Sequence, residues 1–190
     1  MSLPTRTYRR VIGAMAELLL LPNWFVYQDD TPVPLSIPGR VYWEAIVLTE
    51  SAGKPWARRY ERHQDRPSPK DGDVPGQDDG LVEDDASYGL MQVMGYNIRV
   101  LCGRSQHPED GGRMHFGFAL LPLTNLVLGI RVLLAELRAT GGDVPRALAR
   151  YNGGPTGDRL DENGVMRRQE YVDKVHRNAL RVMRDWEMPG

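Results

Sequence analysis

Residues 40–51, Arg-Val-Tyr-Trp-Glu-Ala-Ile-Val-Leu-Thr-Glu-Ser, form an apolar segment with a carboxylate next to its end. Val41, Ala45 and Leu48 share one stripe at helical spacing, which predicts a helix over this stretch. Glu50 would then stand at the C-terminal end of the helix, where the helix dipole disfavours an anion. Because its neighbours are also apolar, we expect the pKa of Glu50 to be raised.

A carboxylic acid that stays protonated near neutral pH is the group with which a glycosidase protonates a leaving oxygen. A solvated glutamate at an ordinary helix end gives the same local pattern, and for Glu50 taken alone it is the more common interpretation. The chemistry of Glu50 therefore depends on which residues elsewhere in the chain accompany it.

Helical periodicity dominates the chain on both sides of this segment. We expect further helices at about 5–21, 90–101, 120–140 and 166–186, and a short helix capped by Asp143. Four prolines predict an extended connection over 22–40. The single cysteine, Cys102, is expected to be a buried small hydrophobe. The fold class expected is mainly α, with at most a small β-hairpin within 65–86.

The segment 61–86 differs in kind from the rest of the chain. It holds nine acidic and three basic residues together with several prolines and glycines, which predicts a long surface loop. With 190 residues the chain suits one domain. We expect an N-terminal helix and connection over 1–39, a catalytic core over 40–187, and the acidic loop inserted within that core.

Composition excludes several classes of protein. Hydrophobic residues make up 41% of the chain and charged residues 26%, which argues against a disordered chain. A formal net charge of -1 gives no sign of a nucleic-acid partner. The apolar run at 18–21 is too short for a membrane span. The four histidines show no metal-ligand spacing, and no phosphate-binding glycine loop is present, so neither a metal nor a cofactor is expected.

Three further motifs accompany Glu50, and each also has a purely structural interpretation. Gln92, which follows Gly89 and Met91 at a loop-to-helix junction, can donate and accept hydrogen bonds to an amide-bearing sugar. Tyr151 and Asn152 precede a glycine pair that would equally serve as a helix stop. The third motif is a tyrosine at position 171 on an apolar helix face, where tyrosines are usually part of the core.

The ordered set of motifs resembles the lytic transglycosylase domain of the soluble type, which shares a lysozyme-like fold with goose-type lysozymes. The motifs in chain order are Glu50-Ser51, Gly89-Leu90-Met91-Gln92, Tyr151-Asn152-Gly153-Gly154 and Tyr171-Val172. The resemblance covers about residues 40–180. It implies a peptidoglycan-cleaving enzyme that needs no cofactor.

The resemblance also implies a role for each motif residue. Glu50 would protonate the β-1,4 glycosidic oxygen between N-acetylmuramic acid and N-acetylglucosamine, then take a proton from the muramic C6 hydroxyl to close a 1,6-anhydro ring. Tyr171 would hold Glu50 in position. The remaining residues would line or support the substrate cleft: Ser51, Gly89, Met91, Gln92, Tyr151 and Asn152.

Two departures from the family pattern leave alternatives open. The acidic loop lengthens the distance from Glu50 to Gly89, and it contains Glu83, Asp84 and Asp85, which are candidates for a second acid. One of these could place a water for inverting hydrolysis, as goose-type lysozymes do. A non-catalytic wall-binding module of a phage particle or secretion machine is the alternative from another class.

The N-terminal region imitates a signal peptide without matching one. Arg6, Arg9 and Arg10 precede apolar residues, yet no small-x-small cleavage site follows Leu21. We therefore expect an ordinary N-terminal helix. A phage lysis protein, or a wall-remodelling protein carried in a larger assembly, would fit this expectation.

Overall fold

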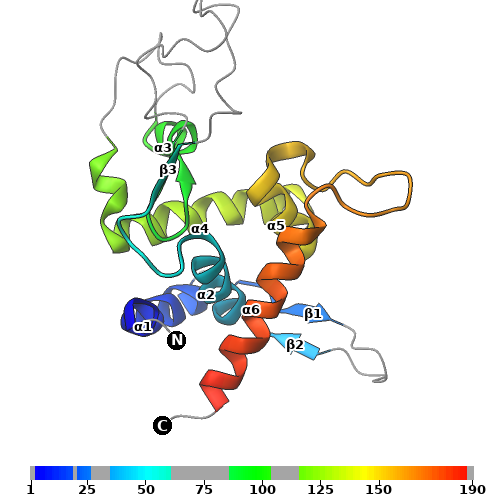
Figure 1. The fold of residues 1–190 in the computed structure, drawn as a ribbon, viewed down its shortest axis with the longest axis horizontal. Coiled ribbons are helices and arrows are strands. Elements are labelled where there is room, and N and C mark those ends of the chain that lie inside the picture. Colours follow the sequence, from blue (N-terminus) through cyan, green and yellow to red (C-terminus); the bar gives the residue numbers. More distant parts are fainter. Residues whose placement is uncertain (1–2, 19–20, 27–34, 61–85, 104–115, 188–190) are drawn as a thin grey trace, which may run out of the picture. The chain divides into compact units, whose positions relative to one another are not determined.

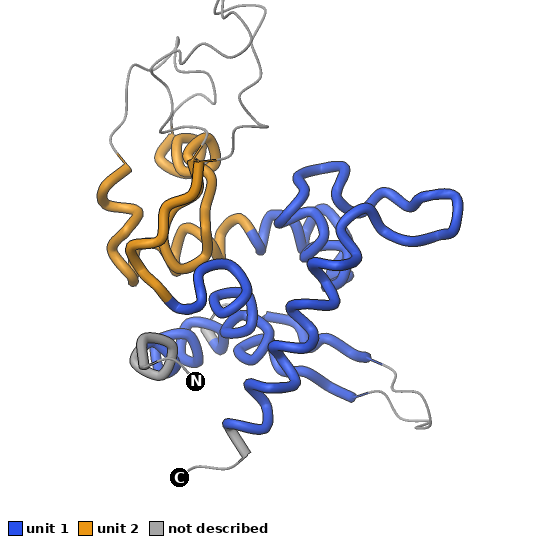
Figure 2. Tube along the Cα trace, viewed as in Figure 1, with its two compact units in different colours: residues 1–53, 133–190 blue, residues 54–132 orange. Residues whose placement is uncertain are grey.

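The computed structural model describes residues 3–18, 21–26, 35–60, 86–103 and 116–187. These residues form two compact units, shown in different colours in Figure 2. Unit 1 comprises residues 1–53 and 133–190, and unit 2 comprises residues 54–132. Helix α4 (Pro122–Ala139) belongs to both, because the division falls within it.

Unit 1 is built around helix α2 (Gly39–Ser51), against which α1 (Leu3–Leu18) and α6 (Gln169–Glu187) pack (Figure 1). The helix expected over 40–51 is thereby confirmed, and it is buried on more sides than one stripe. It starts after Pro38, whose extended backbone cannot continue a helix in the N-terminal direction. Its start also needs Gly39, since a Cβ there would lie 2.5 Å from the Cβ of Leu21.

An ion pair between α1 and α2 was not predicted from the sequence. Glu44 is fully buried on α2, and Arg9 of α1 donates to both of its carboxylate oxygens at 2.9–3.2 Å. A buried carboxylate is costly unless it is paired in this bidentate way. The helix expected at the N-terminus is confirmed over its described part, Leu3–Leu18.

The extended connection expected over 22–40 contains a β-hairpin, which corrects that prediction. Strand β1 (Trp24–Val26) pairs antiparallel with β2 (Leu35–Ile37), with Trp24 opposite Ile37. Both of these side chains are buried. These two apolar side chains thus anchor the base of the hairpin. The strands were not recognised in the sequence because the surrounding prolines indicated a connection.

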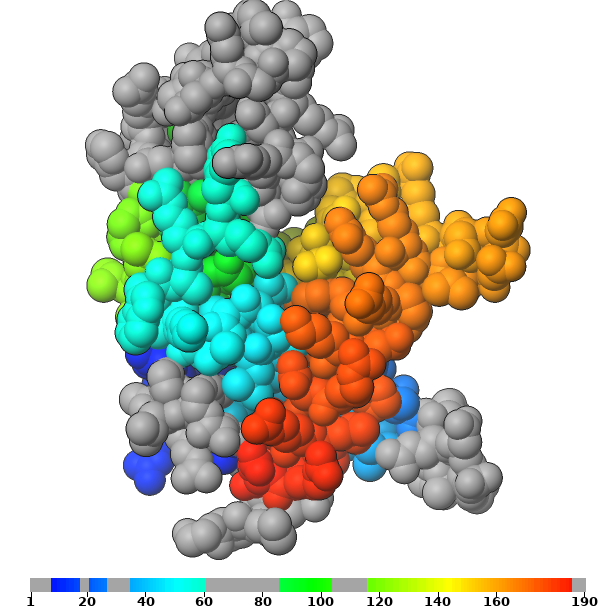
Figure 3. Space-filling model, in the orientation of Figure 1, coloured from blue at the N-terminus to red at the C-terminus, as the bar shows by residue number. Residues whose placement is uncertain are grey.

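The C-terminal helices of unit 1 follow the sequence pattern closely. Helix α5 (Val144–Gly153) begins at Asp143, whose side chain accepts a hydrogen bond from the Arg146 N–H at 3.0 Å, as the capping prediction requires. A short 3-10 helix η4 (Gly154–Thr156) follows. Helix α6 buries four apolar residues that recur at helical spacing: Val172, Val175, Ala179 and Val182. Figure 3 shows its opposite side exposed, in orange to red.

Unit 2 contains a three-stranded antiparallel sheet with two short helical elements. Strand β4 (Ala86–Tyr88) lies between β3 (Arg58–Tyr60) and β5 (Val93–Met94). Helix α3 (Gly95–Leu101) follows β5 directly, and the 3-10 helix η3 (Gly117–Leu120) precedes α4. The Tyr88 ring lies 5.4 Å from the Phe116 ring, and the Arg58 guanidinium stacks over Tyr88.

Unit 2 also corrects two predictions. The helix expected over 90–101 begins only at Gly95, because residues 89–94 form a turn and strand β5. Cys102 is exposed rather than buried, since it follows the last turn of α3 instead of lying on its packed face. The acidic segment 61–85, including nearly all of the hairpin suggested within 65–86, lies outside the described residues. The mainly α class with small antiparallel sheets is confirmed.

His176 couples the packing of unit 1 to pH. Its ring on α6 lies 5.2 Å from the ring of Trp24 on β1. Partial burial lowers the pKa of His176, Arg177 lowers it further, and Asp173 acts in the opposite direction. The folded state therefore binds this proton less well than the unfolded chain does.

We expect stability to fall as pH drops below about 6.5, the ordinary histidine pKa, because the unfolded chain then takes up the proton first. His176→Phe keeps an aromatic ring against Trp24 and removes the titration, so it should flatten this part of the profile. Thermal unfolding midpoints measured between pH 8 and pH 5 test the prediction. Parallel profiles for the two proteins would contradict it.

Candidate functional site

Glu50 occupies the last turn of α2, where the chain leaves the helix sharply. Ala52 adopts a left-handed conformation with φ 53° and donates its N–H to the Leu48 carbonyl at 3.2 Å, which ends the helix. The buried Ser51 hydroxyl donates to the Val47 carbonyl at 3.1 Å and accepts from the Gly53 N–H at 3.2 Å. Ser51 thus holds the turn that follows Glu50.

Tyr171 contacts Glu50 directly. The Tyr171 hydroxyl donates a hydrogen bond of 2.6 Å to Glu50 Oε1, joining residues 121 positions apart. This contact exists because α6 packs along α2 within unit 1. A bond of this length lies at the short end of the range for O–H···O hydrogen bonds. Tyr171, which the sequence pattern alone would place in the core, is therefore hydrogen-bonded to the candidate acid.

A second hydrogen bond ties the same two helices together. The Asn178 side-chain amide on α6 donates to the Thr49 hydroxyl at 2.8 Å, and Thr49 in turn donates to the Ala45 carbonyl at 2.7 Å. Thr49 precedes Glu50, so this bond fixes the helical turn that carries the acid. Sequence analysis missed both residues, because a threonine and an asparagine at these positions carry no pattern of their own.

Tyr151 lies near the end of α5, where the charge of Glu50 affects its pKa. Burial raises the pKa of Tyr151 well above its usual range, and the negative charge of Glu50 raises it further. Tyr151 therefore remains a neutral phenol at any physiological pH. Unit 1 thus brings Glu50, Tyr151 and Tyr171 together, three residues that the sequence had selected separately.

An ion-pair network holds the end of α5 that carries Tyr151. Arg150 Nε lies 2.6 Å from Glu136 Oε2, and the guanidinium also lies 3.8 Å from Asp158. Arg146 pairs with the same aspartate at 2.8 Å. The hydrogen bond with Glu136 raises the pKa of Arg150. Arg150 thus has a structural partner on α4.

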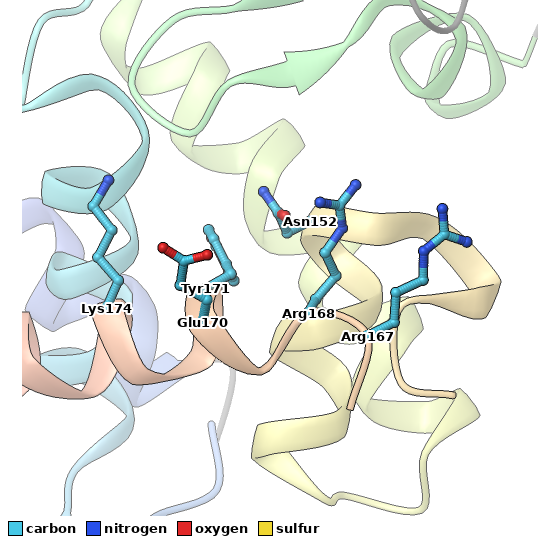
Figure 4. A pocket seen from close by; sticks show the side chains of 6 residues that line it. All are labelled: Asn152, Arg167, Arg168, Glu170, Tyr171 and Lys174. Atoms are coloured by element: carbon cyan, nitrogen blue, oxygen red, sulfur yellow. The ribbon is translucent and has the colours of Figure 1, made fainter. Parts of the chain in front are cut away.

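Asn152 follows Tyr151 and lines a pocket of about 200 Å³ at the start of α6. Figure 4 shows its amide beside the guanidinium of Arg168. The lining consists of Asn152, Arg167, Arg168, Glu170, Tyr171 and Lys174. The pocket therefore includes the tyrosine that is bonded to Glu50.

In unit 2, the 89–92 turn is clamped from inside by Asn125 of α4. The Asn125 amide nitrogen donates to the carbonyls of Tyr88 and Ala119 at 2.7 and 2.8 Å, while its oxygen accepts from the Met91 N–H at 2.7 Å. Gly89 has φ +75°, and a Cβ there would lie 2.4 Å from the Asn125 amide nitrogen. Glycine is required at position 89 for both reasons.

Gln92 is almost completely buried, with 8% of its surface exposed. Its amide nitrogen donates to the Gly89 and Ala57 carbonyls at 2.9 and 3.1 Å, and its oxygen accepts from the Ser87 hydroxyl at 2.8 Å. Its backbone has φ 47°, a conformation that non-glycine residues rarely adopt and that often marks functional sites. The amide that sequence analysis assigned to sugar recognition thus also secures the turn.

Met91 is fully buried, and Gly129 of α4 makes room for it. A Cβ at position 129 would lie 2.4 Å from the Met91 sulfur. The side chain therefore packs in the interior of unit 2, and its contribution to a sugar subsite stays a prediction. Gly89, Met91 and Gln92 are brought together in one turn.

Glu83, Asp84 and Asp85, the candidates for a second acid, lie outside the described residues. Within the described ranges, no three histidine, cysteine, aspartate or glutamate side chains gather in a way that could hold a metal ion. The helices that the structure describes include none with the length and apolar character of a membrane span.

Comparison with known proteins gives one result. The family model described as the transglycosylase SLT domain matches residues 41–173, which is more than half of the chain. No match was found among curated proteins or among solved structures. The matched range begins in α2 and ends in α6, so it contains every motif residue named above.

Asn125→Ala is expected to lower the free energy of unfolding by about 3 kcal/mol, because it removes three hydrogen bonds to buried backbone groups. Chemical denaturation followed by circular dichroism measures the change. Asn97→Ala, at a half-exposed position on α3, is the matched control and should cost well under about 1 kcal/mol. Equal losses in the two variants would contradict the clamp.

Proposed function

The chain belongs to the transglycosylase SLT domain family, and we propose that it cleaves peptidoglycan strands as a lytic transglycosylase, with Glu50 as both acid and base. Family membership supports peptidoglycan cleavage of the lytic transglycosylase kind in general. The observation that carries the assignment of Glu50 as the acid is the 2.6 Å hydrogen bond from Tyr171 to Glu50. It supports a carboxyl group held in one orientation, which proton transfer at a fixed atom requires.

In the first step, protonated Glu50 gives its proton to the glycosidic oxygen between N-acetylmuramic acid and N-acetylglucosamine. The bond from this oxygen to muramic C1 breaks, and its electron pair stays with the leaving hydroxyl of N-acetylglucosamine. Because Tyr171 donates to Oε1, we assign the transferred proton to Oε2. The acetamido oxygen of the muramic residue stabilises the positive charge that develops at C1.

In the second step, the Glu50 carboxylate takes the proton of the muramic C6 hydroxyl while the C6 oxygen bonds to C1. This closes a 1,6-anhydro ring and returns Glu50 to its protonated form. The substrate supplies its own nucleophile, so the reaction consumes no water and needs no second carboxylate. The same group acts as acid and then as base, as general acid–base catalysis by a single residue allows.

The neighbouring residues support this chemistry without adding charge to it. Tyr151 stays neutral because burial and the charge of Glu50 raise its pKa, so it acts as a hydrogen-bonding group rather than as a second base. Asn152 lines the pocket beside Tyr171, which supports a role in substrate binding. Ser51 holds the turn after Glu50.

Gly89, Met91 and Gln92 are assigned to shaping a sugar subsite through the 89–92 turn. What supports this assignment is the strained backbone of Gln92 and the clamp on the turn by Asn125. A conformation that needs several hydrogen bonds to persist is more common at functional sites than elsewhere. The side-chain amide of Gln92 then acts mainly by fixing the turn.

Hydrolysis is the alternative reaction, and it needs a carboxylate that activates water at a distance from Glu50. Its candidates are Glu83, Asp84 and Asp85, and the two reactions differ in the sugar end that they leave. The other alternative is a non-catalytic wall-binding module. The short bond between Tyr171 and Glu50 favours an enzyme, because a binding module has no need to orient a single carboxyl group.

Glu50→Gln should lower the rate of murein cleavage by at least about a thousandfold, since the amide can neither donate nor accept the catalytic proton. Release of soluble fragments from purified murein measures the rate, and pelleting with murein measures binding, which should be retained. Glu162→Gln, at an exposed glutamate, is the matched control and should cleave normally. A Glu50→Gln protein that cleaves at the control rate would refute the assignment.

Tyr171→Phe should lower kcat about tenfold to a hundredfold and leave KM nearly unchanged, because it removes the hydrogen bond that orients the Glu50 carboxyl group. The measurement is steady-state cleavage of a soluble glycan substrate. Tyr8→Phe, which removes a phenol hydroxyl on α1, is the control. A change confined to KM would show that Tyr171 binds substrate rather than holding Glu50.

A further inference from the structure

The pocket at the start of α6 is rich in positive charge. Of its six lining residues, three are cations and one is a carboxylate. In Figure 4 the side chains of Arg167, Arg168 and Lys174 rise from the same side of the chain. The positive end of the α6 helix dipole lies at the same place and adds to this charge. The pocket is therefore suited to an anion.

Among the residues that the structure describes, no ion pair neutralises the charges in this pocket. Glu170 and Lys174 lie one helical turn apart, at a spacing that commonly forms an ion pair, yet no such pair is present between them. The Arg167 guanidinium donates to the hydroxyl of Thr156, at 3.3 Å. Arg168 Nε has no hydrogen-bond partner among the described residues.

The position of Arg168 depends on Gly153, which follows Tyr151 and Asn152 in their motif. Its side chain lies over Gly153, where a Cβ would be 2.6 Å from Arg168 Cγ and 2.9 Å from Nε. Its backbone N–H donates to the Gly157 carbonyl at 3.1 Å. Gly153 thus has a second use besides ending α5, since its lack of a side chain lets an arginine lie against Asn152.

We propose that this pocket binds carboxylates of the stem peptide carried by the N-acetylmuramic acid residue that is cleaved. The proposal rests on the proposed function, because Tyr171 lines the pocket and also holds Glu50. Glu50 acts at C1 of the muramic ring, and the stem peptide is attached through C3 of the same ring. The anionic stem peptide is therefore attached to the sugar close to the acid, and the three cations of the pocket lie in the same region.

The size of the pocket indicates which part of the stem it takes. A volume of about 200 Å³ is below the range of sites that enclose a whole small molecule. It suits one carboxylate-bearing residue, such as the acidic second residue of the stem. Arg167 and Lys174 are exposed to solvent, so the attraction is expected to weaken with ionic strength.

The test compares murein with free stem carboxylates against the same murein after its carboxylates have been converted to amides. We expect the wild-type protein to cleave the acidic form with about a tenfold higher kcat/KM at low salt, mainly through KM. Lys174→Gln and Arg167→Gln should each reduce this preference severalfold. Both side chains are exposed, so neither variant is expected to disturb folding.

Arg181→Gln is the matched control, because Arg181 is an exposed cation on the same helix outside the pocket. It should keep the wild-type preference. Equal cleavage of acidic and amidated murein by the wild-type protein would overturn the proposal. So would an equal loss of preference in Lys174→Gln and Arg181→Gln, because that would indicate general attraction to a basic helix.

A binding measurement separates failure of this proposal from failure of the proposed function. Calorimetry with a soluble disaccharide–peptide and its amidated form reports on the pocket without requiring cleavage. Preferential binding of the acidic form, lost in Lys174→Gln, would support the pocket even if no murein were cleaved. Equal affinity for the two forms would overturn the proposal even in an active enzyme.

Discussion

The packing of α6 along α2 is the constraint on which the candidate site depends. It places Tyr171 2.6 Å from Glu50 and Asn178 2.8 Å from Thr49, so two hydrogen bonds fix the turn that carries the acid. The buried apolar side of α6 supplies the packing, and its polar side supplies these donors. Stability and chemistry therefore share one interface, because the helix that packs on α2 also carries the tyrosine that bonds to the acid.

Much of this site could be predicted from the sequence, because its residues stand in short motifs with recognisable order. The end of α2, the cap at Asp143 and the apolar face of α6 each have a local signal, and the structure confirms them. The predicted start of α3 was wrong because Gln92 has a positive φ, which interrupts the helix. A glutamine gives no sign in the sequence that it will adopt this conformation. The tertiary clamp by Asn125 and the side-chain hydrogen bonds of Gln92 itself stabilise that conformation.

Other features depend on pairs of residues far apart in the chain. Neither Arg9 nor Glu44 reveals by itself that it belongs to a buried ion pair between α1 and α2. The basic pocket likewise arises because Gly153 admits Arg168 beside Asn152. In the sequence, Gly153 indicates only the end of one helix, and Arg168 only the charged start of another. The pocket forms because α5 and α6 pack together in unit 1.

The central claim is that Glu50 acts alone and that the muramic residue supplies the nucleophile. Mass spectrometry of the fragments released from purified murein tests this claim most directly, because the two reactions differ by one water in each product. The account predicts fragments that end in 1,6-anhydromuramic acid. Fragments with reducing muramic ends would contradict it and would show that water attacks C1.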